Sequence, residues 1–538
     1  MKSCALMLMW LICLLPAKAA WAVTTVRLCD SDTQAGAGPN LQQALAGGGT
    51  IVFACPRASV RVTSPHRVPP DTVLDGGDAV TLDGHGLPGP FITSSSGRVF
   101  VRRITIRNFT GRPPSRPPAP GYLSLGRLWG SVLEVRGDAE LDHVTIESCI
   151  SPLNVSGDLV ISDSMFRANS GAGPDAWGTT IIKRSTFLAN ESGPTLRSGR
   201  VDDSAFIENT GIALSVSEPS GPVGILHSSF QRNALALQLS EQSAFGGVAT
   251  VSVRSNRFED NTRGAIASFD IVEFARERGM PPSMIANLER LPGARYELAY
   301  DRFLRNKGAR GAAIDVDLRR SGGMTVVGGL FIGNVAAGEG GAIAVRGGTL
   351  RVSHSLLRSN QSVGPGSAIR AVAGAAARLE LSNSLVIENV GPGAAIDADA
   401  AALANVTIAR NEGKGLAVRS PSSVANSILS DNKSGNCSGL SAQAFHGGNL
   451  QFGSTDCPGV AVGDPFLDAL YVPELGSPAL ELGDAAICRS DPVRGTDILF
   501  QERLGSACAL GAYERAPLRI VEQMRNDRPA RGPAENNR

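Results

Sequence analysis

The feature that most constrains this sequence is a nine-residue pattern that recurs about every 20 to 29 residues, with one gap of about 45. Residues 161–169 read ISDSMFRAN, and residues 201–209 read VDDSAFIEN. A repeat of this length is typical of a solenoid, in which each copy forms one turn. The copies end at Cys149, Asn169, Asn190, Asn209, Asn233, Asn261, Asn306, Asn334, Asn360, Asn389, Asn411 and Asn432.

Three further columns align with this last residue. Eight positions before it stands an aliphatic residue, as at Ile161 and Val201, and five positions before it Ser recurs, as at Ser164 and Ser204. Three positions before it stand Phe166, Phe187, Phe206, Phe230, Phe258, Phe303 and Phe331, followed by Leu357, Val386, Ile408 and Leu429. An offset of two residues between the Ser and Phe columns matches strand alternation, so both columns face the same side.

These columns predict an all-β fold. The copies are too short for pairs of helices and lack the Leu/Asn spacing of leucine-rich horseshoes. We therefore expect a parallel β-helix whose turns stack about 4.8 Å apart. Phe, Ser and aliphatic side chains should form ladders inside it, and the Asn column should occupy a bend where left-handed backbone geometry is tolerated.

The first 22 residues predict export. They combine Lys2, an apolar run and small residues before position 23, which is typical of a cleaved secretory signal peptide and too short for a membrane span. We expect a secreted or periplasmic protein with no membrane span. Lys2 and Lys18 leave with the signal, which takes the formal net charge from +1 to −1. This charge gives no reason to expect a nucleic acid as partner.

Cysteine spacing predicts disulfides in an oxidising compartment. Six of the cysteines after the signal form three sequence-local couples, Cys29 with Cys55, Cys437 with Cys457, and Cys488 with Cys508. The remaining one, Cys149, lies inside the repeat, so we expect a small buried apolar side chain and not a reactive thiol.

Both ends of the chain resemble known β-helix proteins. Residues 41–86 contain an amphipathic stretch followed by GGTIVF and LDGHG, which resembles the opening of secreted right-handed β-helix proteins of the pectate-lyase-like superfamily. The segments NCSG, GGNL, GDPFL, GSPALELGD and CALGAYE are similar, in order, to the end of bacterial exported β-helix proteins with a choice-of-anchor Q module. The resemblance implies a right-handed, single-stranded parallel β-helix with capped ends. It implies no single activity, because the fold hosts lyases, hydrolases, epimerases and adhesins.

These features divide the chain into five parts. After the signal we expect an N-terminal cap with the first coils, β-helix repeats containing a helical insertion near 269–292, a C-terminal cap module and a polar, disordered tail. The signal covers residues 1–22, the N-terminal cap with the first coils 23–100, the repeats 101–435, the C-terminal cap module 436–514 and the tail 515–538.

Candidate ligand-binding residues follow the aliphatic column at an outward-facing corner. In the first six copies this corner is rich in charge, whereas later copies are mostly neutral and end in Asn383, Asn405 and Asn426. Carboxylates with an Arg or Lys between them suit acid/base chemistry on a uronic acid sugar, or Ca²⁺ bridging to it. The alternative is a surface ion-pair ladder without function. The candidates are His143, Asp163, Arg184, Asp203 and His227.

Two loops add aromatic candidates beside this corner. Residues 111–130 contain Trp129, and residues 170–179 contain Trp177. Flat aromatic rings on loops can stack on sugars, although each ring can equally cover the small core of its own loop. The six His residues are scattered, so we expect no metal cluster and no cofactor, apart from Ca²⁺ if the protein is a polysaccharide lyase.

Two functions from different classes remain. The first is a non-catalytic, monomeric, exported β-helix that binds or scaffolds polysaccharide or cell-surface material. The second is a lyase, hydrolase or epimerase that acts on an acidic glycan at the charged corner. We favour the first, because motifs such as GHG at 84–86 lack the partner residues that catalysis requires.

Overall fold

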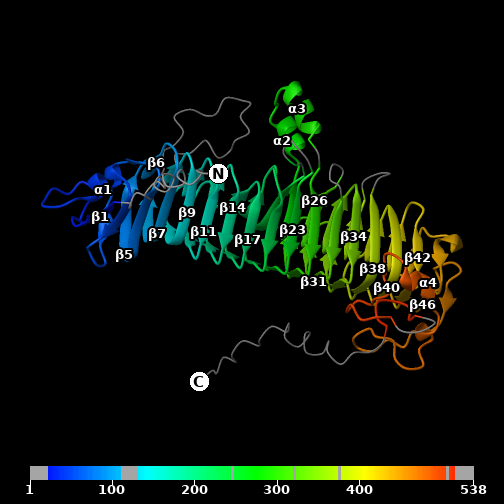
Figure 1. Ribbon diagram of the computed structural model, residues 1–538. Coiled ribbons are helices and arrows are strands. Elements are labelled where there is room, and N and C mark those ends of the chain that lie inside the picture. The colour runs from blue at the N-terminus through cyan, green and yellow to red at the C-terminus, as the bar shows by residue number, and fades with distance from the viewer. Residues whose placement is uncertain are drawn as a thin grey trace, which may run out of the picture.

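The protein is a parallel β-helix: a rod of stacked coils with a small N-terminal cap at one end and a C-terminal module at the other (Figure 1). This computed structural model describes residues 22–110, 131–241, 243, 248–291, 293–318, 323–372, 377–503 and 508–514. Within these residues, the largest sheet has 29 strands, a second has 15 and a third has 3. The all-β fold expected from the repeat is confirmed.

Each coil contributes two short strands to the largest sheet, and in some coils the two run together as one strand. The first line includes β5 (Thr72–Leu87), β7 (Arg98–Phe109), β9 (Asp138–Glu147), β11 (Leu159–Ser162), β14 (Thr180–Lys183), β17 (Gly199–Asp202), β20 (Val223–Leu226), β23 (Thr250–Arg254), β26 (Arg295–Ala299), β30 (Met324–Val327), β34 (Thr349–Ser353), β38 (Arg378–Ile387), β40 (Ala400–Ala409) and β42 (Ser423–Ala425). The second line includes β12 (Met165–Arg167), β15 (Thr186–Leu188), β18 (Ala205–Ile207), β21 (Ser229–Gln231), β24 (Arg257–Glu259), β27 (Arg302–Leu304), β31 (Leu330–Ile332), β35 (Leu356–Arg358) and β43 (Ile428–Ser430).

The 15-stranded sheet closes the coils on another side. Its strands include β8 (Leu133–Val135), β10 (Leu153–Val155), β13 (Asp175–Ala176), β16 (Thr195–Leu196), β19 (Ile212–Val216), β22 (Leu235–Ser240), β25 (Ile266–Phe269), β29 (Ile314–Asp317), β33 (Ile343–Arg346), β37 (Ile369–Ala371), β39 (Ile396–Ala398), β41 (Leu416–Val418) and β44 (Cys437–Ser438). The third sheet contains β28 (Lys307–Gly308), β32 (Val335–Ala336) and β36 (Gln361–Ser362).

The repeat columns are ladders inside the rod. Phe166 pairs in register with Phe187, and the stack continues to Phe331 with ring centroids 4.7–5.0 Å apart. Ile161 of the aliphatic column is fully buried, and so are its in-register partners. Ser164 is also buried, and its hydroxyl accepts a hydrogen bond from the backbone N–H of Val144 in the preceding coil. Side chains of equal size at equal positions allow successive coils to pack without cavities.

The Asn column differs from our expectation. Asn190 is buried, and its Oδ1 accepts hydrogen bonds from both the backbone N–H and the side-chain Nδ2 of Asn169. The left-handed backbone belongs instead to the preceding residue, for example Ala189 with φ 53°. The turn thus directs the Asn amide inward, where it satisfies buried backbone groups from coil to coil.

Both ends of the rod are closed, and one insertion projects from its side. Helix α1 (Leu41–Gly47), with a capping box between Asn40 and Gln43, covers the first coils beside β1 (Val23–Val26) and β2 (Thr50–Phe53). Helices α2 (Ile271–Glu277) and α3 (Pro282–Glu289) stand out from the rod (Figure 1) and share a small apolar core. Among the described residues, no helix combines the length and apolar character needed to cross a membrane.

The three expected disulfides are confirmed. Cys29 is bonded to Cys55 in the N-terminal cap. The other two, Cys437–Cys457 and Cys488–Cys508, lie at the C-terminal end. Cys149 is free and buried, and burial raises the pKa of its thiol to about 12, so it remains an unreactive thiol.

Candidate functional site

The five corner residues predicted from the sequence lie on five successive coils, where the first strand line bends into the second. We call this set the charged corner. Each residue has a positive φ, between 45° and 55°, which turns the chain sharply and directs the side chain outward. The register of the neighbouring strands aligns them along the rod at about 4.8 Å per coil. The charged corner comprises His143, Asp163, Arg184, Asp203 and His227.

One ion pair crosses the middle of the charged corner. The Nε and Nη2 atoms of Arg184 lie 2.7 and 2.5 Å from the two carboxylate oxygens of Asp163. These hydrogen bonds lower the pKa of the Asp163 carboxyl. An anion stabilised in this way is a weak general base, so Asp163 is suited to binding more than to proton abstraction. This contact is also the one that a purely structural ion ladder would form.

The coils bring each corner His beside two carboxylates, which the scattered positions in the sequence did not reveal. His227 Nδ1 lies 3.2 Å from Asp202 Oδ1, and in the set Asp202, Asp203 and His227 one ligand atom from each residue lies within 4.8 Å of the others. Asp142, His143 and Asp163 form an equivalent set. Two carboxylates with an imidazole are donors that divalent cations accept.

Two charged groups of this region make no direct hydrogen bond or ion pair with the described residues, although Asp203 is close enough to Arg184 to raise the pKa of that guanidinium. Among the residues that the structure describes, the Lys183 ammonium and the Asp203 carboxylate form no hydrogen bond or ion pair, unlike Arg184 and Asp202. Lys183 ends strand β14, and its register partner is Asp202, the residue before Asp203. A free cation and a free anion therefore lie on adjacent coils, available to a ligand.

An open surface depression lies beside these groups on the outer face of β17, β20 and β23. It forms over Gly224, because glycine has no side chain to fill the space, and Arg200 and Arg254 lie on either side of it. Arg200 reaches Asp202 at 3.3 Å, and Arg254 reaches Glu297 at 3.5 Å. The depression continues the charged corner onto the sheet.

The later part of the same corner is covered by the C-terminal module. The Asn383 amide donates to the Val493 carbonyl at 3.0 Å, and the Asn405 amide donates to the Ala509 carbonyl at 3.2 Å. This explains the neutral end of the column: Asn tolerates the left-handed turn and offers a hydrogen bond to the module. The charged corner lies within the part of this edge that the module leaves uncovered.

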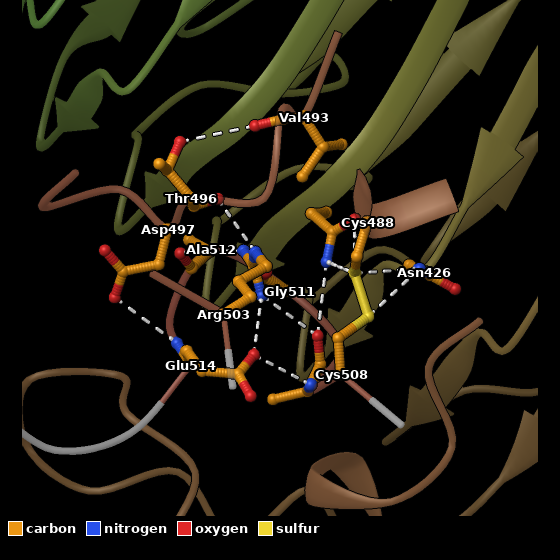
Figure 2. Close-up of polar contacts among 12 residues, drawn as sticks. Asn426, Cys488, Val493, Thr496, Asp497, Arg503, Cys508, Gly511, Ala512 and Glu514 are labelled. Carbon is orange, nitrogen blue, oxygen red and sulfur yellow. Dashed lines mark hydrogen bonds and ion pairs between the residues drawn. A yellow bond between two sulfur atoms is a disulfide. The ribbon is translucent and has the colours of Figure 1, made fainter. Parts of the chain in front are cut away.

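Arg503 holds the module together next to this edge (Figure 2). Its side chain is 1% exposed, and it donates to the carboxylate of Glu514 and to the carbonyl oxygens of Thr496, Ala509, Gly511 and Ala512. A buried guanidinium with this many acceptors fixes the position of the chain around it.

Trp177, one of the two predicted aromatic residues, does not join the charged corner. Trp177 precedes strand β14 whereas Arg184 follows it, so about 13 Å of strand separates them at about 3.3 Å per residue. Trp177 is 46% exposed, and its ring lies against the Arg197 guanidinium, 4.6 Å away. Trp129 lies outside the described residues.

One aromatic residue of the corner, Tyr300, was not among the predicted candidates. Tyr300 stands six residues before Asn306, as Asp163 stands before Asn169, so the column itself could have identified it. Arg200 was not among the candidates either, and the sequence carries no comparable signal for it.

Comparisons with known proteins do not identify a family for this chain. No protein-family model matches the chain, and no curated protein sequence matches it. Among solved structures, tailspike protein 3 of bacteriophage CBA120 is 10% identical, with a TM-score of 0.32 over 82% of this chain. The chain spans 59% of the length of that tailspike.

Two other solved structures are similar over most of their length. The A-module of the mannuronan C-5 epimerase AlgE6 from Azotobacter vinelandii is 9% identical, with a TM-score of 0.22, covering 79% of this chain and 94% of the module. Pectate lyase Pel9A is 12% identical, with a TM-score of 0.22, covering 92% of this chain and 96% of the enzyme. At these identities the likeness concerns the fold alone.

Proposed function

We propose that the protein is an exported, non-catalytic β-helix that binds an acidic polysaccharide along the charged corner and the adjoining depression. The observation that carries this proposal is the pair of unpaired charges on adjacent coils. The Lys183 ammonium can bind a sugar carboxylate, and the Asp203 carboxylate can accept hydrogen bonds from sugar hydroxyl groups. Successive coils lie about 4.8 Å apart, close to the length of one hexose unit, so an extended chain can meet them in turn.

Export belongs to the same proposal. Three disulfides suit an oxidising compartment, and residues 1–22 carry the features of a cleaved signal peptide. The C-terminal module, of the choice-of-anchor type by resemblance, closes the last coils. The partner is then a polysaccharide or a cell-surface glycan, met by a monomer outside the cytoplasm.

The test compares unpaired with paired charges. Lys183→Ala and Asp203→Ala should each weaken binding of an oligouronate about tenfold, measured by titration calorimetry. Arg232→Ala is the matched control, because Arg232 is an exposed cation paired with Glu208 at a different corner. Equal affinities for all three variants and the wild type would contradict the assignment of the site.

A polysaccharide-active enzyme is the second candidate, and the Asp202, Asp203 and His227 set favours it. An imidazole beside two carboxylates provides an acid and a base, or ligands for Ca²⁺, within reach of the depression. Incubation of wild-type protein with oligouronates, with and without Ca²⁺ and with a chelator, tests this candidate. New unsaturated or shortened products that disappear in His227→Ala would establish an enzyme.

A further inference from the structure

Two exposed aromatic rings meet where the uncovered part of the corner ends. Tyr300 occupies the corner position two coils after His227 and is 55% exposed. Phe500 comes from the C-terminal module and is 44% exposed. Their ring centroids lie 5.9 Å apart with an angle of 50° between the planes. We call Tyr300 and Phe500 the aromatic pair.

The surrounding residues hold both rings in place. Position 328, the corner of the next coil, is Gly, and a Cβ atom there would lie 2.7 Å from Cδ1 of Tyr300. The glycine therefore gives the Tyr300 ring room to lie along the corner. The Phe500 ring stacks on His354 at 4.1 Å with planes 4° from parallel, and His354 Nε2 lies 3.0 Å from the Thr496 hydroxyl.

The backbone conformation of Tyr300 and Phe500 costs the folded protein conformational energy. Tyr300 and Phe500 have φ angles of 60° and 63°, in the left-handed region that bulky side chains avoid. Both rings nevertheless keep a large exposed surface, so packing recovers only part of that cost. Left-handed backbone recurs at the corners of this fold, and what distinguishes Tyr300 and Phe500 is that their two exposed rings meet and offer a ligand a joint apolar surface.

We propose that the aromatic pair is a stacking subsite for a sugar ring at one end of the glycan that lies along the charged corner. This subsite rests on the function proposed above. His227, Ser255 and Tyr300 are corner residues of successive coils, so the pair begins about 10 Å beyond His227. Beyond the pair the module covers the corner at His354 and Asn383, so a bound chain stops or leaves the surface there.

The experiment measures binding of hexameric oligouronates, one galacturonate and one mannuronate, to the full chain by titration calorimetry. Tyr300→Ala and Phe500→Ala should each weaken the affinity about tenfold, because the face of the sugar loses its apolar contact. Tyr300→Phe keeps the ring and should remain within about twofold of wild type. Phe466→Ala is the matched control, since Phe466 is 50% exposed with φ 41° in the same module but outside the pair.

The outcomes separate the two proposals. Thermal unfolding of each variant shows whether the C-terminal module remains docked. If Phe500→Ala loosens the module, the affinity of Tyr300→Ala alone tests the aromatic subsite. Wild-type affinity in Tyr300→Ala, together with weakened binding in Lys183→Ala, would overturn the aromatic subsite and leave the proposed function intact. A wild-type protein that binds neither oligouronate would overturn both.

Discussion

The side-chain amide of Asn426 forms two hydrogen bonds of 2.9 Å with the backbone of Asp484, donating to its carbonyl oxygen and accepting from its N–H. Asn426 is the corner residue of a coil that the module covers, and Asp484 is the N-cap of α4 (Ala485–Arg489) in the C-terminal module. Through these two hydrogen bonds, a side chain at the corner of the rod attaches the module to it.

Replacing Asn426 by Ala should weaken this attachment. The change removes both hydrogen bonds to the Asp484 backbone, and we expect the free energy of unfolding to fall by about 1–3 kcal/mol. Urea denaturation measures the loss. Asp203→Ala is the control, because Asp203 has the same left-handed backbone but is not covered by the module. An equal loss in both variants would mean that the turn, and not the contact, determines the effect.

Replacing Arg503 by Met should be more damaging. The Glu514 carboxylate would remain buried without its cation, which typically costs about 3–5 kcal/mol. The double variant Arg503→Met with Glu514→Leu removes both charges and should recover much of that loss. Denaturant midpoints of the single and double variants test this. A double variant no more stable than Arg503→Met would show that the backbone hydrogen bonds of Arg503, and not its ion pair, carry the stability.

Replacing Phe206 by Ala should cost about 3–5 kcal/mol of unfolding free energy. The ring lies between Phe187 and Phe230, at centroid distances of 4.9 and 4.7 Å, and neither neighbour can fill the cavity without moving a whole coil. Phe445→Ala is the comparison, because Phe445 is only partly buried and lies outside this column. Differential scanning calorimetry should show the larger loss for Phe206→Ala.

Asp301 should make stability depend on pH. It occupies the Ser column, its Oδ2 has no hydrogen-bond partner in the described structure, and burial raises the pKa of its carboxyl to about 8. Between about pH 4 and 8 the unfolded chain has lost this proton while the folded protein keeps it, so rising pH lowers the free energy of unfolding through that window.

Asp301→Asn removes this dependence. Asn fits the position, because Asn256 occupies it one coil earlier and donates to the Ile225 carbonyl. The variant should be roughly 1–3 kcal/mol more stable than wild type at pH 8, with the difference vanishing toward pH 4. Asp78→Asn, an identical substitution at an exposed position, is the comparison against which the trend is measured. A pH-independent difference for Asp301→Asn would exclude titration as its cause.

The repeat was sufficient to predict the architecture. Phe187, Ile182 and Ser185 each meet a side chain of the same kind one coil away, so positions that recur along the chain become neighbours in space. For the same reason, the five residues of the charged corner align as expected. The sequence-local cysteine couples were also sufficient, because each disulfide joins residues 20 or 26 positions apart.

The column alone did not show which way the Asn side chain faces. Whether Asn169 or the residue before it takes the left-handed turn depends on which backbone groups are buried, and these are set by the stacked coils. The sequence also led us to expect Trp177 beside the corner that contains Arg184. It does not reveal that strand β14 lies between these two residues and separates them by its whole length.

The sequence alone determined the solenoid, its internal ladders, the charged edge and the disulfide couples, because these depend on contacts between equivalent positions of successive repeats. Only the tertiary structure decided which part of that edge is open. The C-terminal module folds back over Asn383, Asn405 and Asn426 and brings Phe500 to Tyr300, contacts between residues up to 200 positions apart. No periodic pattern encodes them, because they depend on the path of one irregular segment and on hydrogen bonds that form only once it has docked.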